Sequence, residues 1–176
     1  GSIIVLLVVI NALLAPIFAP YDPNDSDLSK RLLPPSWEED GNTEHFLGTD
    51  HLGRDVMSRI IFGTRISLLV GIITVLISGF FGTILGLIGG YYRGFIDSFL
   101  MRLTEVQLAF PFILLALAIM AVLGPGLKNV ILVLSVTGWV MYTRLVRGEV
   151  LLLRELEYVK AAKALGQKNR KIMFGH

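Results

Sequence analysis

The residues best suited to metal chemistry are His45, Asp50 and His51. Imidazole and carboxylate groups are common ligands of divalent metals. His51 directly follows Asp50, so the two side chains need not point the same way, and no further ligand stands at a recognisable spacing. We therefore expect a solvated loop here and no metal site.

Catalytic and nucleotide-binding patterns are not found in the sequence. The chain contains no Cys, which excludes disulfides, Cys-based zinc sites and thiol catalysis. Ser, His and Asp occur outside any G-x-S-x-G context, and neither a G-x-x-x-x-G-K-[ST] loop nor a G-x-G-x-x-G motif is present. The basic C-terminal stretch lacks interleaved aromatic residues, so nucleic-acid binding is not expected. The sequence predicts neither an enzyme nor a cofactor bound on this chain.

The composition of the 176 residues is that of a membrane protein. Hydrophobic residues make up 53% and charged residues 17%, with a mean hydropathy of +0.67. A helix needs about 20 apolar residues to cross a bilayer. We predict an all-α, polytopic transmembrane bundle with a first span at residues 1–20, an external acidic loop at 21–65, spans two to four within 66–146, and a cytoplasmic loop at 147–176. The spans within 66–146 are expected at residues 66–92, 106–127 and 130–146, with a kink at Pro111.

Charge sets the predicted orientation. Residues 20–64 hold nine acidic and four basic residues, whereas residues 144–176 hold eight basic and three acidic ones. The positive-inside rule places residues 93–102 and the C-terminal stretch in the cytoplasm and the acidic loop outside. No predicted span carries an ionisable residue near its middle, which argues against a proton- or ion-coupled carrier.

The second predicted span carries glycines at positions 79, 82, 86, 89 and 90. Spacings of three and four place them along one helix face, where small residues let helix backbones approach closely. Packing within one subunit is the favoured interpretation, and a dimer contact or a pathway lining is the alternative.

Residues 149–176 are expected to form a helix, a glycine turn and a second helix. Leu152, Leu156, Val159 and Ala162 repeat at helical spacing, and Gly166 suits the end of a helix. Such a basic hairpin on the cytoplasmic side would dock into another protein or lie on anionic lipid.

Two motifs carry a family resemblance. YVKAAKALG at 158–166, followed by nine residues and His176, resembles the cytoplasmic EAA loop of ABC importer permeases in its peptide-permease form. Lys160 stands where the general motif has Glu. FLGTDHLGRDVMSRIIFGTRISLLVG at 46–71 and FAPYDPN at 18–24 resemble the C-type permeases of dipeptide, oligopeptide and nickel importers.

The resemblance implies a type I ABC importer permease fold in a bacterial or archaeal inner membrane, with about four of six spans in this chain. It implies a subunit that forms half of the pathway for di- or oligopeptides beside a second homologous permease. An external binding protein would deliver substrate, and two cytoplasmic ATPase subunits would hold the ATP and Mg. The implied ATPase-coupling residues are Glu157, Tyr158, Val159, Ala161, Ala162, Leu165, Gly166 and His176. Nickel or another small substrate, or a non-transport scaffold with a lipid-binding hairpin, are the alternatives.

Overall fold

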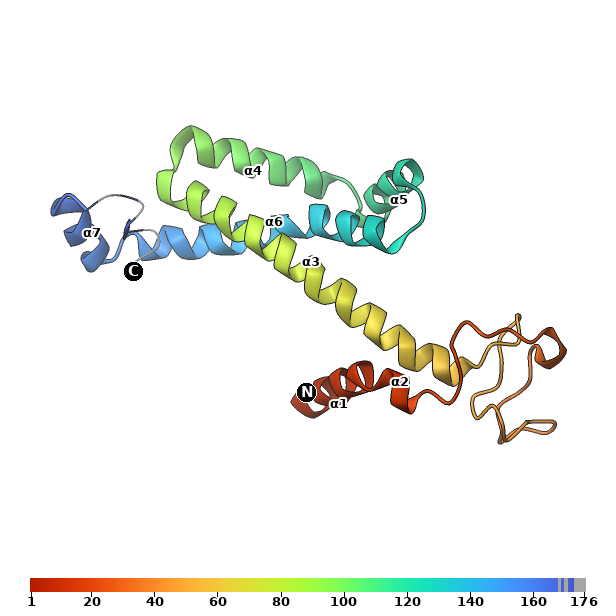
Figure 1. Ribbon diagram of the computed structural model, residues 1–176. Helices are drawn as coiled ribbons and strands as arrows, with labels where there is room; N and C mark the ends of the chain where they lie inside the picture. Colours follow the sequence, from red (N-terminus) through yellow and green to blue (C-terminus); the bar gives the residue numbers. More distant parts are fainter. Residues whose placement is uncertain (168, 170, 173–176) are drawn as a thin grey trace. The chain divides into compact units, whose positions relative to one another are not determined.

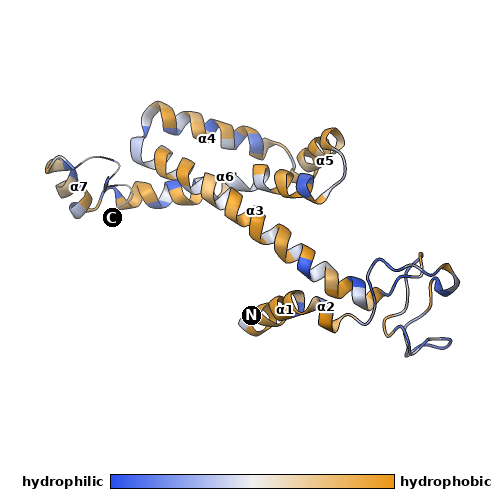
Figure 2. Ribbon diagram, viewed as in Figure 1, coloured by the Kyte–Doolittle hydropathy of each residue, from blue (hydrophilic) through white to orange (hydrophobic). Residues whose placement is uncertain are grey.

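The computed structural model describes residues 1–167, 169 and 171–172, and in these residues every extended regular element is helical (Figure 1). The chain divides into two compact units, residues 1–71 and 72–176. The hydropathy of the helices is uneven: some are apolar throughout, and others carry polar faces (Figure 2). The all-α prediction is therefore confirmed for the described part of the chain.

The first apolar segment is broken. α1 spans Ser2–Leu13, and α2 spans Ala15–Phe18, with Leu14 between them at φ −95° and ψ 12°. Pro16 lies at the start of α2, where it has no N–H to continue the hydrogen-bond ladder of α1. The expected span at residues 1–20 is thus a short apolar helix followed by a single turn.

The loop after α2 is built around polar side chains. Asp50 accepts hydrogen bonds from the backbone N–H groups of Leu52 (2.8 Å) and Arg54 (3.1 Å), and it pairs with the side chains of Arg54 (2.8 Å) and Arg59. Burial would raise the pKa of Asp50, but these hydrogen bonds, first that of the Arg54 side chain, outweigh it and hold the pKa below its usual value.

α3 spans Val56–Tyr92 and begins earlier than the sequence predicts. Asp55 stands just before it, and its carboxylate accepts from the backbone N–H of Ser58 at 2.7 Å, as an N-cap residue does. Residues 56–65, assigned to the external loop from charge alone, are therefore helical. The predicted second span at 66–92 is contained in this helix, whose 37 residues exceed the length needed to cross a bilayer.

The second unit contains three further long helices. The chain reverses at Arg93, whose φ is +56°, and α4 then spans Gly94–Ala109. α5 spans Phe112–Leu123, bent by 88° from α4 at a break that contains Pro111. α6 spans Leu127–Leu153.

These bounds change the predicted layout. α3 and α6 are long and apolar enough to cross a membrane, and the bent pair of α4 and α5 could form a third span. The kink at Pro111 is confirmed, but residues 94–102 are helical, where the sequence predicts a short connection. α6 likewise extends beyond the expected span at 130–146 in both directions.

Small residues bring α3 and α6 into backbone contact. A Cβ placed on Gly82 would lie 2.6 Å from the carbonyl oxygen of Trp139, and one on Gly86 would lie 2.6 Å from that of Thr143. One turn further, a Cβ on Gly90 would lie 3.0 Å from the carbonyl oxygen of Arg147. The residue numbers on α3 and on α6 increase in the same direction along this contact, so the two helices are parallel. This confirms that the glycine face packs within one chain.

Candidate functional site

The C-terminal helix α7 spans Glu157–Ala164 and is separate from α6. The chain turns at Arg154, and the last residue of α6 is Leu153. The stripe predicted as one helix from Leu152 to Ala162 is therefore split between two helices. Leu152 and Leu156 are 69% and 44% exposed, so they do not belong to the buried face of α7.

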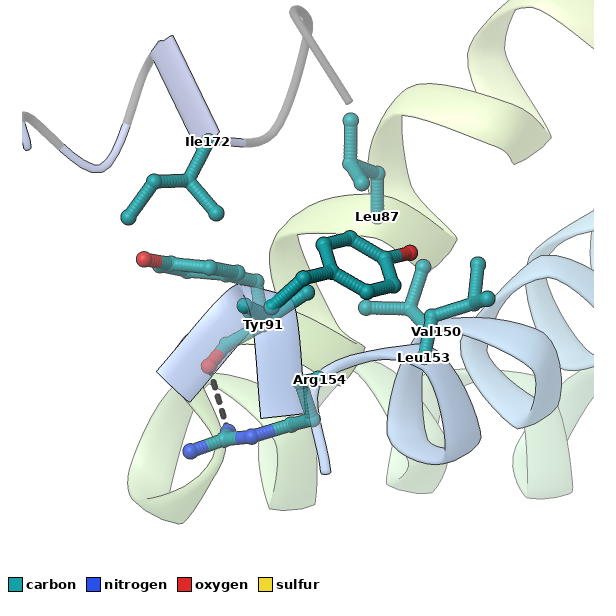
Figure 3. A pocket seen from close by; sticks show the side chains of 8 residues that line it. Leu87, Tyr91, Val150, Leu153, Arg154 and Ile172 are labelled. Carbon is teal, nitrogen blue, oxygen red and sulfur yellow. Dashed lines mark hydrogen bonds between the residues drawn. The ribbon is translucent and has the colours of Figure 1, made fainter. Parts of the chain in front are cut away.

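Arg154 joins the end of α6 to the end of α3. Its guanidinium donates to the carbonyl oxygen of Tyr91 at 2.6 Å (Figure 3) and to that of Gly90 at 3.4 Å. The last carbonyls of a helix lack partners within it, and a cation there is favourable. Nearby, Arg93 pairs with Glu155 at 3.4 Å. The C-terminal ends of the two helices thus lie together, and α7 begins beside them.

The inner face of α7 packs near the C-terminal end of α3. Val159 and Ala162 are each 8% exposed and cluster with Ile172, with Tyr91 of α3 packed against them. The hydroxyl of Tyr91 donates to the side-chain oxygen of Asn169 at 2.8 Å. A small cavity of about 80 Å³ lies beside Tyr91 and Val159, and it is also lined by Leu87, Val150 and Leu153 (Figure 3). Val159 and Ala162 therefore position the helix and do not face outward.

The other predicted coupling residues that the structure describes are exposed, although Tyr158 also lines the cavity beneath α7. Glu157, Ala161 and Gly166 are exposed, as are Tyr158 (48%) and Leu165 (84%). His176, predicted as the last coupling residue, lies outside the described residues. Most of the second helix expected at 168–174 does so too, although Asn169, Lys171 and Ile172 are helical.

Gly166 ends α7 as the sequence predicts. Its φ is +74°, its N–H donates to the carbonyl oxygen of Lys163 at 3.0 Å, and the N–H of Gln167 donates to that of Ala162 at 3.1 Å. These two bonds form a Schellman motif, which requires the left-handed conformation that glycine adopts most easily. A Cβ on Gly166 would meet no atom within 4 Å, so the constraint is conformational rather than steric.

The charges around α7 are paired at its base. The ammonium of Lys160 lies 3.2 Å from the carboxylate of Glu155. This hydrogen bond, with the charge of Lys160, lowers the pKa of Glu155. Glu157 lies three positions before Lys160, a spacing at which helix side chains can pair, but the turn after α6 brings Glu155 to Lys160.

His45, Asp50 and His51, the residues that the sequence analysis weighed as metal ligands, lie in different surroundings in the structure. His45 is 6% exposed and its Nδ1 lies 3.0 Å from the Asp55 carboxylate, while its ring packs on Tyr21 at 4.8 Å between centroids. The expectation of a solvated loop is thus wrong for His45, although His51 is exposed. Within the residues that the structure describes, no group of three or more His, Cys, Asp or Glu could hold a metal ion.

Tyr91 and Arg154 are the residues of this site that sequence reasoning missed. Tyr91 reads as an interfacial aromatic residue, and Arg154 reads as one of several cytoplasmic cations. Their roles depend on helices far apart in sequence, so no local signal could have indicated them.

Residues 82–176 match the family described as binding-protein-dependent transport system inner membrane component. Residues 1–35 match the N-terminal TM domain of oligopeptide transport permease C. The chain is 43% identical over 174 residues to the dipeptide transport system permease protein DppC of Haemophilus influenzae, covering 99% of this chain and 59% of the relative.

Two further relatives show the same pattern. The glutathione transport system permease protein GsiD of Pectobacterium atrosepticum is 41% identical over 100% of this chain and 57% of its own length. The oligopeptide transport system permease protein OppC of Bacillus subtilis is 37% identical over 100% of this chain and 56% of its own length. The chain thus spans between half and two thirds of the length of these relatives, which are transport permeases and not enzymes.

Proposed function

Because the chain belongs to the family of binding-protein-dependent transport system inner membrane components, we propose that it is part of a permease subunit that imports di- or oligopeptides. The matched relatives carry peptide or glutathione transport in their names, which supports this substrate class. The subunit would form half of the pathway in a bacterial or archaeal inner membrane, crossing it several times. Its partners would be a second homologous permease, an external binding protein and two cytoplasmic ATPase subunits that hold the ATP and Mg.

The observation that carries the coupling role is the way α7 is held. Its inner face is fixed on Tyr91, and Arg154 ties the adjoining turn to the last carbonyls of α3. Glu157, Ala161, Leu165 and Gly166 are exposed on a helix fixed to two candidate spans, and Tyr158 is partly exposed while it also lines the cavity beneath that helix. We infer that these residues dock into a groove on an ATPase subunit, and that nucleotide-driven movement of that groove is passed to the spans.

Uptake measurements test the substrate class. Cells with the gene disrupted and cells with it restored would be compared for uptake of a labelled dipeptide, a longer peptide and nickel ion. Loss of peptide uptake that returns on restoration would support the proposal and give a size preference. Loss of nickel uptake alone would identify nickel as the substrate. No change in the uptake of any of the three would refute the claim that the substrate is a peptide.

A matched pair of variants tests the coupling role. Asn adopts the left-handed conformation more readily than a β-branched residue, so Gly166→Asn should retain peptide transport and Gly166→Val should lose most of it. Membrane insertion and the amount of protein should be equal in both, because a side chain at this position meets open space. ATPase subunits should co-purify with Gly166→Asn and not with Gly166→Val. Equal transport by the two variants would refute the coupling assignment.

A further inference from the structure

One face of α4 is charged and exposed. Arg102 and Glu105 pair at 3.2 Å, and their side chains are 80% and 60% exposed (Figure 2 shows the polar residues of α4). The opposite face is buried, since Leu100 and Thr104 are 9% and 1% exposed. The sequence places residues 93–102 in a short cytoplasmic connection, so this face was not among the candidate sites.

Two contacts between α4 and α6 show which part of α6 lies beside the charged face of α4. Asp97 near the start of α4 pairs with Arg147 near the end of α6. Gln107 near the end of α4 accepts a hydrogen bond from the indole N–H of Trp139 at 2.9 Å. The two helices are therefore antiparallel, and Glu105 lies near the level of Trp139, about halfway along α6.

Charged groups at that level need water or protein beside them. A carboxylate or guanidinium near the middle of a bilayer is costly when it faces lipid, and such residues mark ion and substrate pathways. The charged face of α4 borders a groove of about 450 Å³ lined by Asp97, Ser98, Met101, Arg102, Glu105 and Arg147. A polar groove of this size along a candidate span is suited to hold water.

We propose that the face of α4 formed by Ser98, Arg102 and Glu105 lines a water-filled pathway and contacts the terminal charges of short zwitterionic peptides. The inference rests on the proposed transport function. Arg102 would bind the peptide carboxylate through its planar guanidinium, and Glu105 would bind the peptide ammonium.

The spacing of the two charges fits such a substrate. Side chains three apart on a helix have Cβ atoms about 5–6 Å apart. An extended dipeptide spans at most about 7 Å, so its two termini can reach both side chains at once. Without peptide the two side chains neutralise each other, so peptide binding exchanges one set of charge pairs for another and leaves no group uncompensated.

Cysteine labelling tests whether this face of α4 is accessible to water. The chain has no Cys of its own, so Ser98→Cys and Leu103→Cys each introduce a single thiol into it. Leu103 is 42% exposed on the apolar side of α4 and serves as the matched control. In membranes that hold the full permease with its partners, a charged, water-soluble methanethiosulfonate should modify position 98 at least about tenfold faster than position 103. The dipeptide alanyl-alanine should slow the reaction at 98 only.

Substrate preference tests the charge contacts. Glu105→Gln should raise the KM for alanyl-alanine by about tenfold, the effect of one charge-assisted hydrogen bond, and leave the KM for N-acetyl-alanyl-alanine unchanged. Equal labelling at positions 98 and 103, or an equal change in both KM values, in a complex whose wild type imports peptide would overturn this inference alone. A wild-type complex that imports no peptide would overturn the proposed function itself.

Discussion

The contact between α3 and α6 makes a sharp prediction for Gly86. A Cβ at this position would lie 2.6 Å from the carbonyl oxygen of Thr143, 2.9 Å from the Cβ of Val146 and 3.1 Å from the backbone N of Arg147. Two of these three atoms are backbone, so no change of rotamer can relieve the clash. Gly86→Ala must therefore push the helices apart by several tenths of an ångström.

The expected cost follows from the packing that is lost. Overpacking a tight interface costs about 1–3 kcal/mol, and a gap of 0.5–1 Å forfeits about a quarter to a half of each dispersion contact along the seam. Gly79 supplies the matched control, because a Cβ there would lie 3.8 Å from the Tyr142 ring, an ordinary contact. Gly79→Ala carries the same change in helix propensity without the clash, so it should be neutral or stabilising.

Thermal stability of the purified permease complex is the appropriate measurement. The fraction of monodisperse complex after heating would be followed by size-exclusion chromatography for the wild type and both variants. Gly86→Ala should melt several degrees below Gly79→Ala, at about 2–4 °C for each kcal/mol in a domain of ordinary size. Equal melting of the two variants would refute the close parallel seam, and with it the arrangement of α3 and α6 described above.

Two further perturbations follow from the polar contacts. Arg154→Ala should lower the melting temperature and release the α7 segment to limited proteolysis, because the last carbonyls of α3 at Tyr91 lose their donor; Arg154→Lys should be intermediate. Asp50→Asn should destabilise the loop at neutral pH because Arg54 loses its charged partner. The pKa of Asp50 is lower in the folded than in the unfolded state. The carboxylate therefore stabilises the fold fully above its unfolded pKa, and this stabilisation is lost as the pH falls through its folded pKa. The difference in melting temperature between wild type and Asp50→Asn should therefore shrink as the pH falls below about 4, and a constant difference down to pH 2 would contradict this.

Local signals were enough to predict several elements. The charge-free run at 66–92, the bend at Pro111 and the helix stop at Gly166 each depend on residues within a few positions of one another. The glycine face was also readable, because its spacing follows the helix period. Which helix it packs against was not, since α6 lies about 60 positions further along the chain.

The elements that sequence reasoning missed depend on distant partners. α4 breaks the apolar pattern with Asp97, Arg102 and Glu105, so a hydropathy window reads most of it as a connection. Its polar residues are accommodated by tertiary contacts, such as the bond between Gln107 and Trp139. The burial of His45 likewise depends on Asp55. A sequence shows that such residues are polar but not what they pair with.

The contacts around α7 form a short mechanical path in the proposed mechanism. Three residues, 154–156, separate α6 from α7, and Arg154 fixes this turn to α3. Because the backbones of α3 and α6 touch along the glycine seam, a force on α7 acts on both helices together rather than bending one. α4 is tied to α6 by the Asp97–Arg147 pair, so it would move with them and carry the charged face that we propose contacts the peptide. Breaking that pair by Asp97→Asn should therefore reduce peptide-stimulated ATP hydrolysis more than basal hydrolysis, whereas an equal loss of both would show that the pair serves only the fold.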